Sequence, residues 1–142
     1  MFAITTIMPS FLWGQDLFWS FFMVCIVRLC LTLNITWTVN SVAHIWGNKP
    51  YNKYISPCEN VIVSFAAFGE GWHNYHHTFP WDYRTGELGN FNFTTAFLEL
   101  CNKVGLAYDF KIPSEELIKK TIENKGDGTH KVREVVKEYL EY

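Results

Sequence analysis

Residues 17–33, LFWSFFMVCIVRLCLTL, decide the fold class of this chain. The segment is apolar except for Ser20, Arg28 and Thr32. Extended to about residue 44, it is long enough to cross the hydrocarbon core of a bilayer, which takes roughly 20 helical residues. The sequence therefore predicts an all-α integral membrane protein with one complete transmembrane helix over about 17–44.

Residues 2–13, FAITTIMPSFLW, are also apolar but too short to span a bilayer. No basic segment precedes them, and apolar character continues past any plausible cleavage site, which argues against a signal peptide. We expect 2–13 to be the end of a transmembrane helix that starts before this chain, with a tight turn at 14–16. Residues 1–45 would then form a transmembrane hairpin whose first helix is truncated, in a fragment of a longer protein; the alternative is that Met1 is a genuine start.

The distribution of basic residues predicts which end of the helix at 17–44 faces the cytosol. The 14–16 turn carries no Lys or Arg, whereas Lys49 and Lys53 follow the helix. The positive-inside rule therefore puts the residues after 45 in the cytosol. We expect a cytosolic helical region over 46–112 and a charged helical tail over 113–142. The expected helices lie at 58–70, 93–105, 114–124 (capped by Ser114) and 130–141, with turns at 48–57 and loop at 79–92.

Composition excludes several classes of protein. The 142 residues include 12 Lys and Arg and 14 Asp and Glu, for a net charge of −2, and no basic run. Nucleic-acid binding therefore has no electrostatic basis. The four cysteines form no CxxC pair, which argues against a disulfide framework or a zinc ribbon.

The most informative motif is GEGWHNYHH at 69–77, with three of the five histidines of the chain in five positions. His73, His76 and His77 stand at i, i+3 and i+4, which share one face of a helix with Cβ atoms about 5–6 Å apart. This spacing favours one or two metal ions bound by imidazole nitrogens over an exposed polar helix end. Iron and zinc both suit such ligands. Asn74 and Tyr75 stand where an HExxH zinc hydrolase places its glutamate, so that chemistry loses support.

A second group of polar residues lies inside the predicted membrane helix. Thr36, Asn40 and His44 fall within about 80° of helical arc. Polar side chains at membrane depth are costly and usually face a bundle interior or a site. Asn40 and His44 are therefore candidate metal ligands from the membrane side. The alternatives are a backbone hydrogen bond for Thr36, an interhelical one for Asn40 and an interfacial position for His44.

The stretch from Asn34 to about Tyr108 resembles the C-terminal half of membrane acyl-CoA desaturases, of the stearoyl-CoA Δ9-desaturase type and its insect relatives. GEGWHNYHH resembles the third histidine box of that family. The resemblance covers most of the chain and weakens after about residue 128. Four motifs carry it: NxTWxVNSxAH at 34–44, KPYNKYISPCEN at 49–60, GEGWHNYHHTFPWDYR at 69–84 and GLAYDF at 105–110.

The resemblance implies a multi-pass enzyme of the endoplasmic reticulum membrane with a cytosolic C-terminus. Such enzymes insert a cis double bond into a fatty acyl-CoA with O₂, in unsaturated fatty acid biosynthesis. Two iron ions (Fe²⁺) are held by histidine boxes, and cytochrome b5 donates the electrons. By motif position Asn40 reaches its iron through water, and Trp37 and Thr36 lie beside the acyl tunnel. The implied iron ligands are His44, His73, His76 and His77.

The chain also departs from this family. Two further histidine boxes are expected in a missing N-terminal half, and the remaining histidine, His130, lies in the charged tail. We therefore expect this chain alone to be inactive and to bind metal weakly. Three alternatives stay open: a related di-iron membrane hydroxylase or a desaturase of lipid-linked chains, a truncated non-catalytic membrane protein that pairs with a full-length relative, and a soluble helical zinc protein, which conflicts with 17–44.

Overall fold

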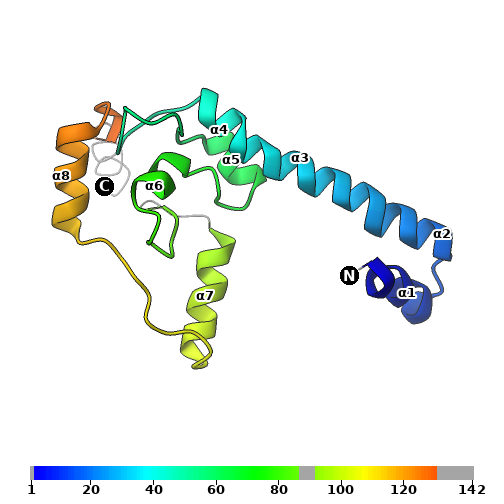
Figure 1. Ribbon diagram of the computed structural model, residues 1–142. Coiled ribbons are helices and arrows are strands. Elements are labelled where there is room, and N and C mark those ends of the chain that lie inside the picture. The colour runs from blue at the N-terminus through cyan, green and yellow to red at the C-terminus, as the bar shows by residue number, and fades with distance from the viewer. Residues whose placement is uncertain (1, 87–91, 131–142) are drawn as a thin grey trace, which may run out of the picture. The chain divides into compact units, whose positions relative to one another are not determined.

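Helices joined by loops make up the part of the chain that the structure describes. The structure is a computed structural model (Figure 1), and it describes residues 2–86 and 92–130. Within these residues no strand forms, and the extended pairings are two isolated β-bridges. The prediction of a helical protein is confirmed. The chain divides into two compact units, Met1–Trp37 and Thr38–Tyr142.

The first unit is a helical hairpin. Helix α1 (Phe2–Trp13) ends at Gly14, which has a φ of +66°, a left-handed conformation that glycine adopts without steric cost. Helix α2 (Leu17–Trp19) begins at Asp16, whose side chain accepts hydrogen bonds from the backbone N–H groups of Phe18 at 3.0 Å and Trp19 at 3.1 Å. The predicted turn at 14–16 is therefore built from a left-handed glycine and a side-chain cap.

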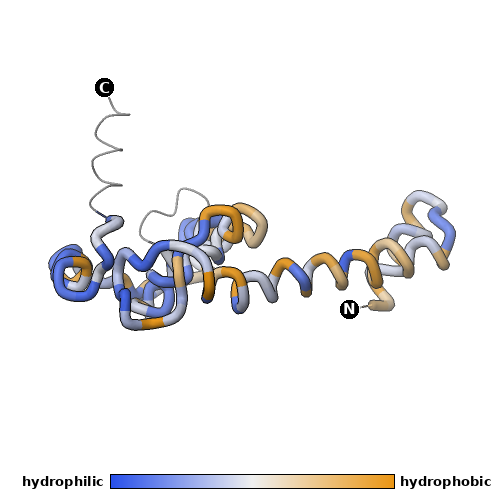
Figure 2. Tube along the Cα trace, turned by 90° about the horizontal axis from the view of Figure 1, so that it is seen from above, coloured by the Kyte–Doolittle hydropathy of each residue, from blue (hydrophilic) through white to orange (hydrophobic). Residues whose placement is uncertain are grey.

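The helical run Leu17–Ile45 is long and apolar enough to cross a membrane. Its 29 residues, at 1.5 Å per residue, measure about 43 Å, against about 30 Å for a hydrocarbon core. The run comprises α2, the π-helical segment η1 (Ser20–Val27), α3 (Arg28–Asn40) and α4 (Val42–Ile45). Figure 2 shows hydrophobic residues along it, interrupted by a few hydrophilic ones. The long helix predicted at about 17–44 is confirmed.

A buried cysteine marks the packing of α1 against η1. The Cys25 side chain is fully buried, and its Sγ lies 3.2 Å from Thr6 Oγ1 and 3.4 Å from Thr5 Oγ1. A π-helical turn widens the helix and reorients the side chains that follow. In the first unit, α1 and η1 are therefore in contact through the Cys25 thiol and the hydroxyls of Thr5 and Thr6, within an otherwise apolar hairpin.

The second unit has an aromatic core that joins three segments. Tyr51 lies in the segment before α5 (Val61–Ala66), Tyr75 and Phe79 belong to α6 (His73–Thr78) and its C-cap, and Ile118 lies on α8 (Glu115–Lys125). The ring of Tyr75 is 4.9 Å from that of Tyr51 and 5.0 Å from that of Phe79. The histidine-bearing helix α6 is thereby fixed against the rest of the unit.

Two of the predicted helices are observed close to their expected bounds. Helix α7 (Phe93–Lys103) begins at Asn92, whose side chain accepts from the N–H of Thr95 at 2.9 Å. Helix α8 begins at the predicted cap, Ser114, whose Oγ accepts from the N–H of Leu117 at 3.3 Å. The helix predicted at 130–141 and part of the 79–92 loop lie outside the described residues.

The predicted helix at 58–70 is wrong in extent. Only Val61–Ala66 is helical, because the side chain of Asn60 caps the helix and Phe68 takes a φ of +54°. The residues just before it, 58–60, are extended, and Glu59 forms β-bridges to Asn48 and to Trp72. The apolar pattern therefore overestimated a helix whose first turn is used for pairing.

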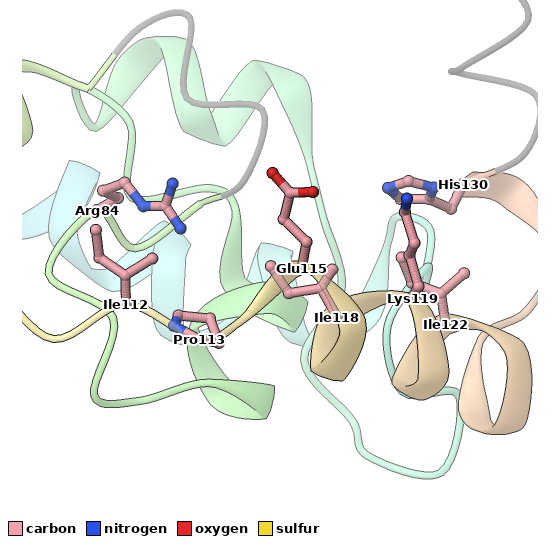
Figure 3. Close-up of a pocket in the computed structure, with 8 residues that line it drawn as sticks. All are labelled: Arg84, Ile112, Pro113, Glu115, Ile118, Lys119, Ile122 and His130. Atoms are coloured by element: carbon pink, nitrogen blue, oxygen red, sulfur yellow. The ribbon is translucent and has the colours of Figure 1, made fainter.

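The packing of α8 leaves a pocket of about 330 Å³ on its inner side. Figure 3 shows an aliphatic floor with polar groups around it. The lining residues are Arg84, Ile112, Pro113, Glu115, Ile118, Lys119, Ile122 and His130.

A buried carboxylate fixes the face of α6 that turns toward the core. Asp82 is 1% exposed, accepts from the hydroxyl of Tyr75 at 2.5 Å and pairs with Arg84 Nη2 at 2.7 Å. Burial by itself would raise the pKa of the Asp82 carboxyl, but the hydrogen bonds from Arg84 and Tyr75 outweigh it and lower that pKa. The carboxylate is therefore charged in the folded protein at neutral pH.

Asp82→Asn should lower the free energy of unfolding at pH 7 by about 1–3 kcal/mol, because Arg84 and Tyr75 lose the charged acceptor of their hydrogen bonds. Because the pKa of Asp82 is lowered on folding, its contribution is complete above about pH 4, the unfolded value, and is lost as the pH falls through the folded value. Denaturant titration of the solubilised chain across this pH range measures both effects. Glu123→Gln, on the exposed face of α8, is the control; equal acid sensitivity of wild type and Asp82→Asn would contradict the assignment.

Candidate metal centre

Three imidazoles converge in the second unit. His44 lies on α4, at the end of the candidate membrane span, and His73 and His77 lie on α6. The Nε2 atom of His73 is 2.9 Å from that of His44 and 3.2 Å from that of His77. The nitrogen atoms that the three residues offer all lie within 4.8 Å of one another.

Two of these spacings, from His73 to His44 and from His73 to His77, are close to those of neighbouring ligands around one cation. A metal–imidazole bond of about 2.1 Å, with ligands 90–109° apart, separates neighbouring nitrogens by about 3.0–3.4 Å. A neutral ring nitrogen carries one proton or one lone pair, so His73 Nε2 cannot make two good hydrogen bonds to its two neighbours. A metal ion satisfies all three nitrogens at once, and the residues present therefore fit one.

The protonation state also suits metal binding. Burial, and then the nearby imidazoles of His77, His44 and His76, lower the pKa of His73 to about 4. The pKa of His77 is also lowered, first by burial and then by the imidazoles of His76 and His44. Imidazole binds metal in its neutral form, so both residues are ready to bind at neutral pH without losing a proton.

His76 stands apart from this group of three. Its ring stacks on that of His73 with centroids 6.0 Å apart, and its centroid is 5.5 Å from that of His77. Its Nδ1 is buried and has no hydrogen-bond partner among the described residues. A buried polar atom without a partner is costly, so the Nδ1 of His76 lacks a hydrogen bond that the described residues would have to supply.

An extended segment, Cys58–Asn60, holds the two histidine-bearing elements together. The N–H of Cys58 donates to the carbonyl of Ala43 at 2.6 Å, next to His44. The N–H of Asn60 donates to the carbonyl of Gly71 at 2.9 Å, two residues before His73. The positions of the three imidazoles are thus set by backbone hydrogen bonds as well as by side-chain packing.

Gly71 is required by this close approach. A Cβ at that position would lie under 3.0 Å from the carbonyl oxygen of Asn60 and from the backbone N of Ser64. The same holds at Gly47, where a Cβ would overlap the backbone of Glu59. Glycine therefore stands in the histidine motif because the backbones of two segments touch there.

Asn74 ties the other side of α6 to the preceding loop. Its side chain is fully buried. Its Oδ1 accepts from the N–H groups of Tyr51 at 2.9 Å and Asn52 at 3.0 Å, and its Nδ2 donates to the carbonyls of Asn52 and Pro57, both at 2.9 Å. All four hydrogen-bonding positions of the amide are used, so the 51–57 segment is fixed to the helix that carries the histidines.

The other predicted site residues lie along the long helix. Asn40 is the last residue of α3 and is exposed, four residues before His44. Thr36 donates its hydroxyl to the carbonyl of Thr32 at 2.9 Å, the backbone bond that the sequence left open as its alternative role. Trp37 is 59% exposed and, with Thr36, belongs to the first unit. Their roles toward a metal or an acyl chain stay predictions.

His130 is buried, with its ring 5.6 Å from that of Tyr51. It lines the pocket beside α8, which offers one imidazole and one carboxylate, from Glu115 (Figure 3). Two donors of this kind are fewer than the three or four that a metal site usually takes from the protein.

Gly71→Ala should push the extended segment Cys58–Asn60, here called the strap, away from the residues that lead into α6. Overlap of a new methyl group with backbone costs about 1–3 kcal/mol in the free energy of unfolding, and Co²⁺ affinity should fall because His73 moves away from His44. Denaturant titration and Co²⁺ titration of the chain in detergent measure the two effects. The exposed neighbour, Glu70→Ala, serves as the control. An alanine variant with unchanged stability and affinity would show that the close contact does not set the site.

Comparison with known proteins shows which proteins this chain is similar to in sequence. No protein-family model matches the chain. It is 52% identical over 133 residues to an acyl-CoA Delta12-desaturase of Acheta domesticus and 49% identical over 133 residues to an acyl-CoA Delta-9 desaturase of the same species; each match covers 92% of this chain and 37% of the relative. It is 47% identical over 129 residues to stearoyl-CoA desaturase 5 of Bos taurus, covering 90% of this chain and 38% of the relative. Over about nine tenths of its length the chain is similar in sequence to acyl-CoA desaturases, and it spans less than two fifths of the length of these relatives.

Proposed function

We propose that this chain is part of a fatty acyl-CoA desaturase that inserts a cis double bond with O₂. The observation that carries the proposal is the convergence of His44, His73 and His77 in a chain about half identical to acyl-CoA desaturases. The names of these relatives favour desaturation over hydroxylation. The chain would supply part of the metal centre, and the rest of the enzyme the remaining ligands.

The proposed metal is iron, as two Fe²⁺ ions. His44, His73 and His77 would hold one ion, with Asn40 reaching it through water, and His76 would turn to the second. The buried Nδ1 of His76 and its place outside the group of three support this division. Iron bound by nitrogen ligands supplies the activation of O₂ that removal of hydrogen from an unactivated methylene pair requires.

The residues of this chain would bind and orient rather than exchange protons. The lowered pKa values of His73 and His77 keep both imidazoles neutral, as ligands must be. Trp37 and Thr36 would lie beside the acyl chain. Their position in the candidate membrane span and the 59% exposure of Trp37 support a contact with a lipid-like group. Such a contact positions one pair of carbons and excludes water.

The remaining parts of the proposal concern location and partners. Residues 1–45 would be a membrane hairpin of the endoplasmic reticulum, 46–112 a cytosolic catalytic region carrying the histidine box, and 113–142 a charged tail. Lys49 and Lys53, just after the span, support a cytosolic C-terminus. The partners would be fatty acyl-CoA, O₂, membrane lipid, the remainder of the desaturase and cytochrome b5 as electron donor.

The test is a chimera in which this chain replaces the matching part of the Acheta domesticus Delta-9 relative. It is expressed in yeast cells without a desaturase of their own, and fatty acids are analysed by gas chromatography and mass spectrometry. The chimera should form unsaturated fatty acids, and His77→Ala should reduce them by at least about 10–100-fold, the loss that removal of a ligand's hydrogen-bond partner alone already causes.

His130→Gln is the matched control, because it removes an imidazole outside the group of three while keeping a polar side chain, and it should retain activity. The proposal would fail if the chimera accumulated in the membrane without forming a double bond. It would also fail if His77→Ala desaturated as well as the unsubstituted chimera.

A further inference from the structure

The other ring nitrogen of His44 has a partner that the sequence did not single out. The Nδ1 atom of His44 lies 3.2 Å from the hydroxyl oxygen of Ser56. An imidazole that binds metal through Nε2 carries its proton on Nδ1, and an acceptor at Nδ1 holds it in that form. We propose that Ser56 is a positioning residue of the metal centre, accepting the Nδ1–H of His44 and so directing the Nε2 lone pair toward His73 and His77.

Ser56 is held in place from both ends of its segment. Asn74 binds the carbonyl of Pro57, the next residue, at 2.9 Å, and the N–H groups of Tyr51 and Asn52 before it. The N–H of Cys58 donates to the carbonyl of Ala43, the residue before His44. The hydroxyl is therefore presented to His44 by a segment fixed both to α6 and to α4, although Ser56 itself is exposed.

The tautomer of His44 decides whether the site can form. Its Nε2 lies 2.9 Å from that of His73. With the proton on Nε2, His44 would donate into the group of three and offer no lone pair to an ion. With the proton on Nδ1 and accepted by Ser56, Nε2 is free to bind. The hydroxyl thus selects the form that a ligand needs, and the inference rests on the ligand role proposed for His44.

The experiment uses the full 142-residue chain in detergent micelles, labelled with ¹⁵N-histidine. Ser56→Ala removes the acceptor and Ser56→Thr keeps it; His44→Ala assigns the signals and shows the contribution of that ligand. Co²⁺ titration should give a Kd about 10–100-fold higher for Ser56→Ala and one within about 2-fold of wild type for Ser56→Thr. In the metal-free chain, ¹⁵N–¹H spectra should show His44 protonated on Nδ1 in wild type and Ser56→Thr, and a mixture of tautomers in Ser56→Ala.

A Ser56→Ala chain with the wild-type His44 spectrum would overturn the inference, and so would a wild-type Co²⁺ affinity in that variant. If the unsubstituted chain takes up no Co²⁺, the spectra alone decide. The chimera separates this inference from the proposed function. If the chimera desaturates but Ser56→Ala leaves the His44 tautomer unchanged, only the role of Ser56 is refuted. If Ser56→Ala shifts the tautomer but the chimera forms no double bond, only the proposed function is refuted.

Discussion

The second unit brings three imidazoles, those of His44, His73 and His77, so close together that their ring nitrogens lie within 4.8 Å of one another. Hydrogen bonds contribute little to this packing. His73 Nε2 faces the Nε2 atoms of both His44 and His77 but can form a hydrogen bond with only one of them. A cation held by these imidazoles would remove this conflict, because each nitrogen would offer its lone pair to the ion. The buried amide of Asn74 and the close contact at Gly71 help to hold the imidazoles in this geometry.

The centre combines two elements of different character. His44 comes from the end of an apolar helix long enough to cross a bilayer, and the other imidazoles come from a short polar helix fixed to an aromatic core. The strap at 58–60 joins them through backbone hydrogen bonds, which depend little on side-chain identity. In the proposed desaturase, this arrangement would place the metal centre at the end of the candidate membrane span.

The sequence predicted the features that depend on local pattern. Length and apolarity indicate the helix at about 17–44, the spacing of His73, His76 and His77 indicates a shared face, and Ser114 indicates a helix start. The extended strap was missed, because its pairing partners lie more than ten residues away and its apolar pattern also fits a helix. Ser56 and Asn74 gave no signal as single residues, since their roles come from loop contacts that only the folded chain creates.

The family resemblance added what spacing alone could not, since it linked His44 to the distant histidine motif. The separate place of His76 came from the structure, through its buried Nδ1 and its exclusion from the group of three. The most direct test of the account is a crystal structure of the whole metal-loaded protein with anomalous scattering from the metal. The account predicts one peak about 2.1 Å from Nε2 of His44, His73 and His77 together; metal peaks near the α6 histidines with none bonded to His44 would contradict it.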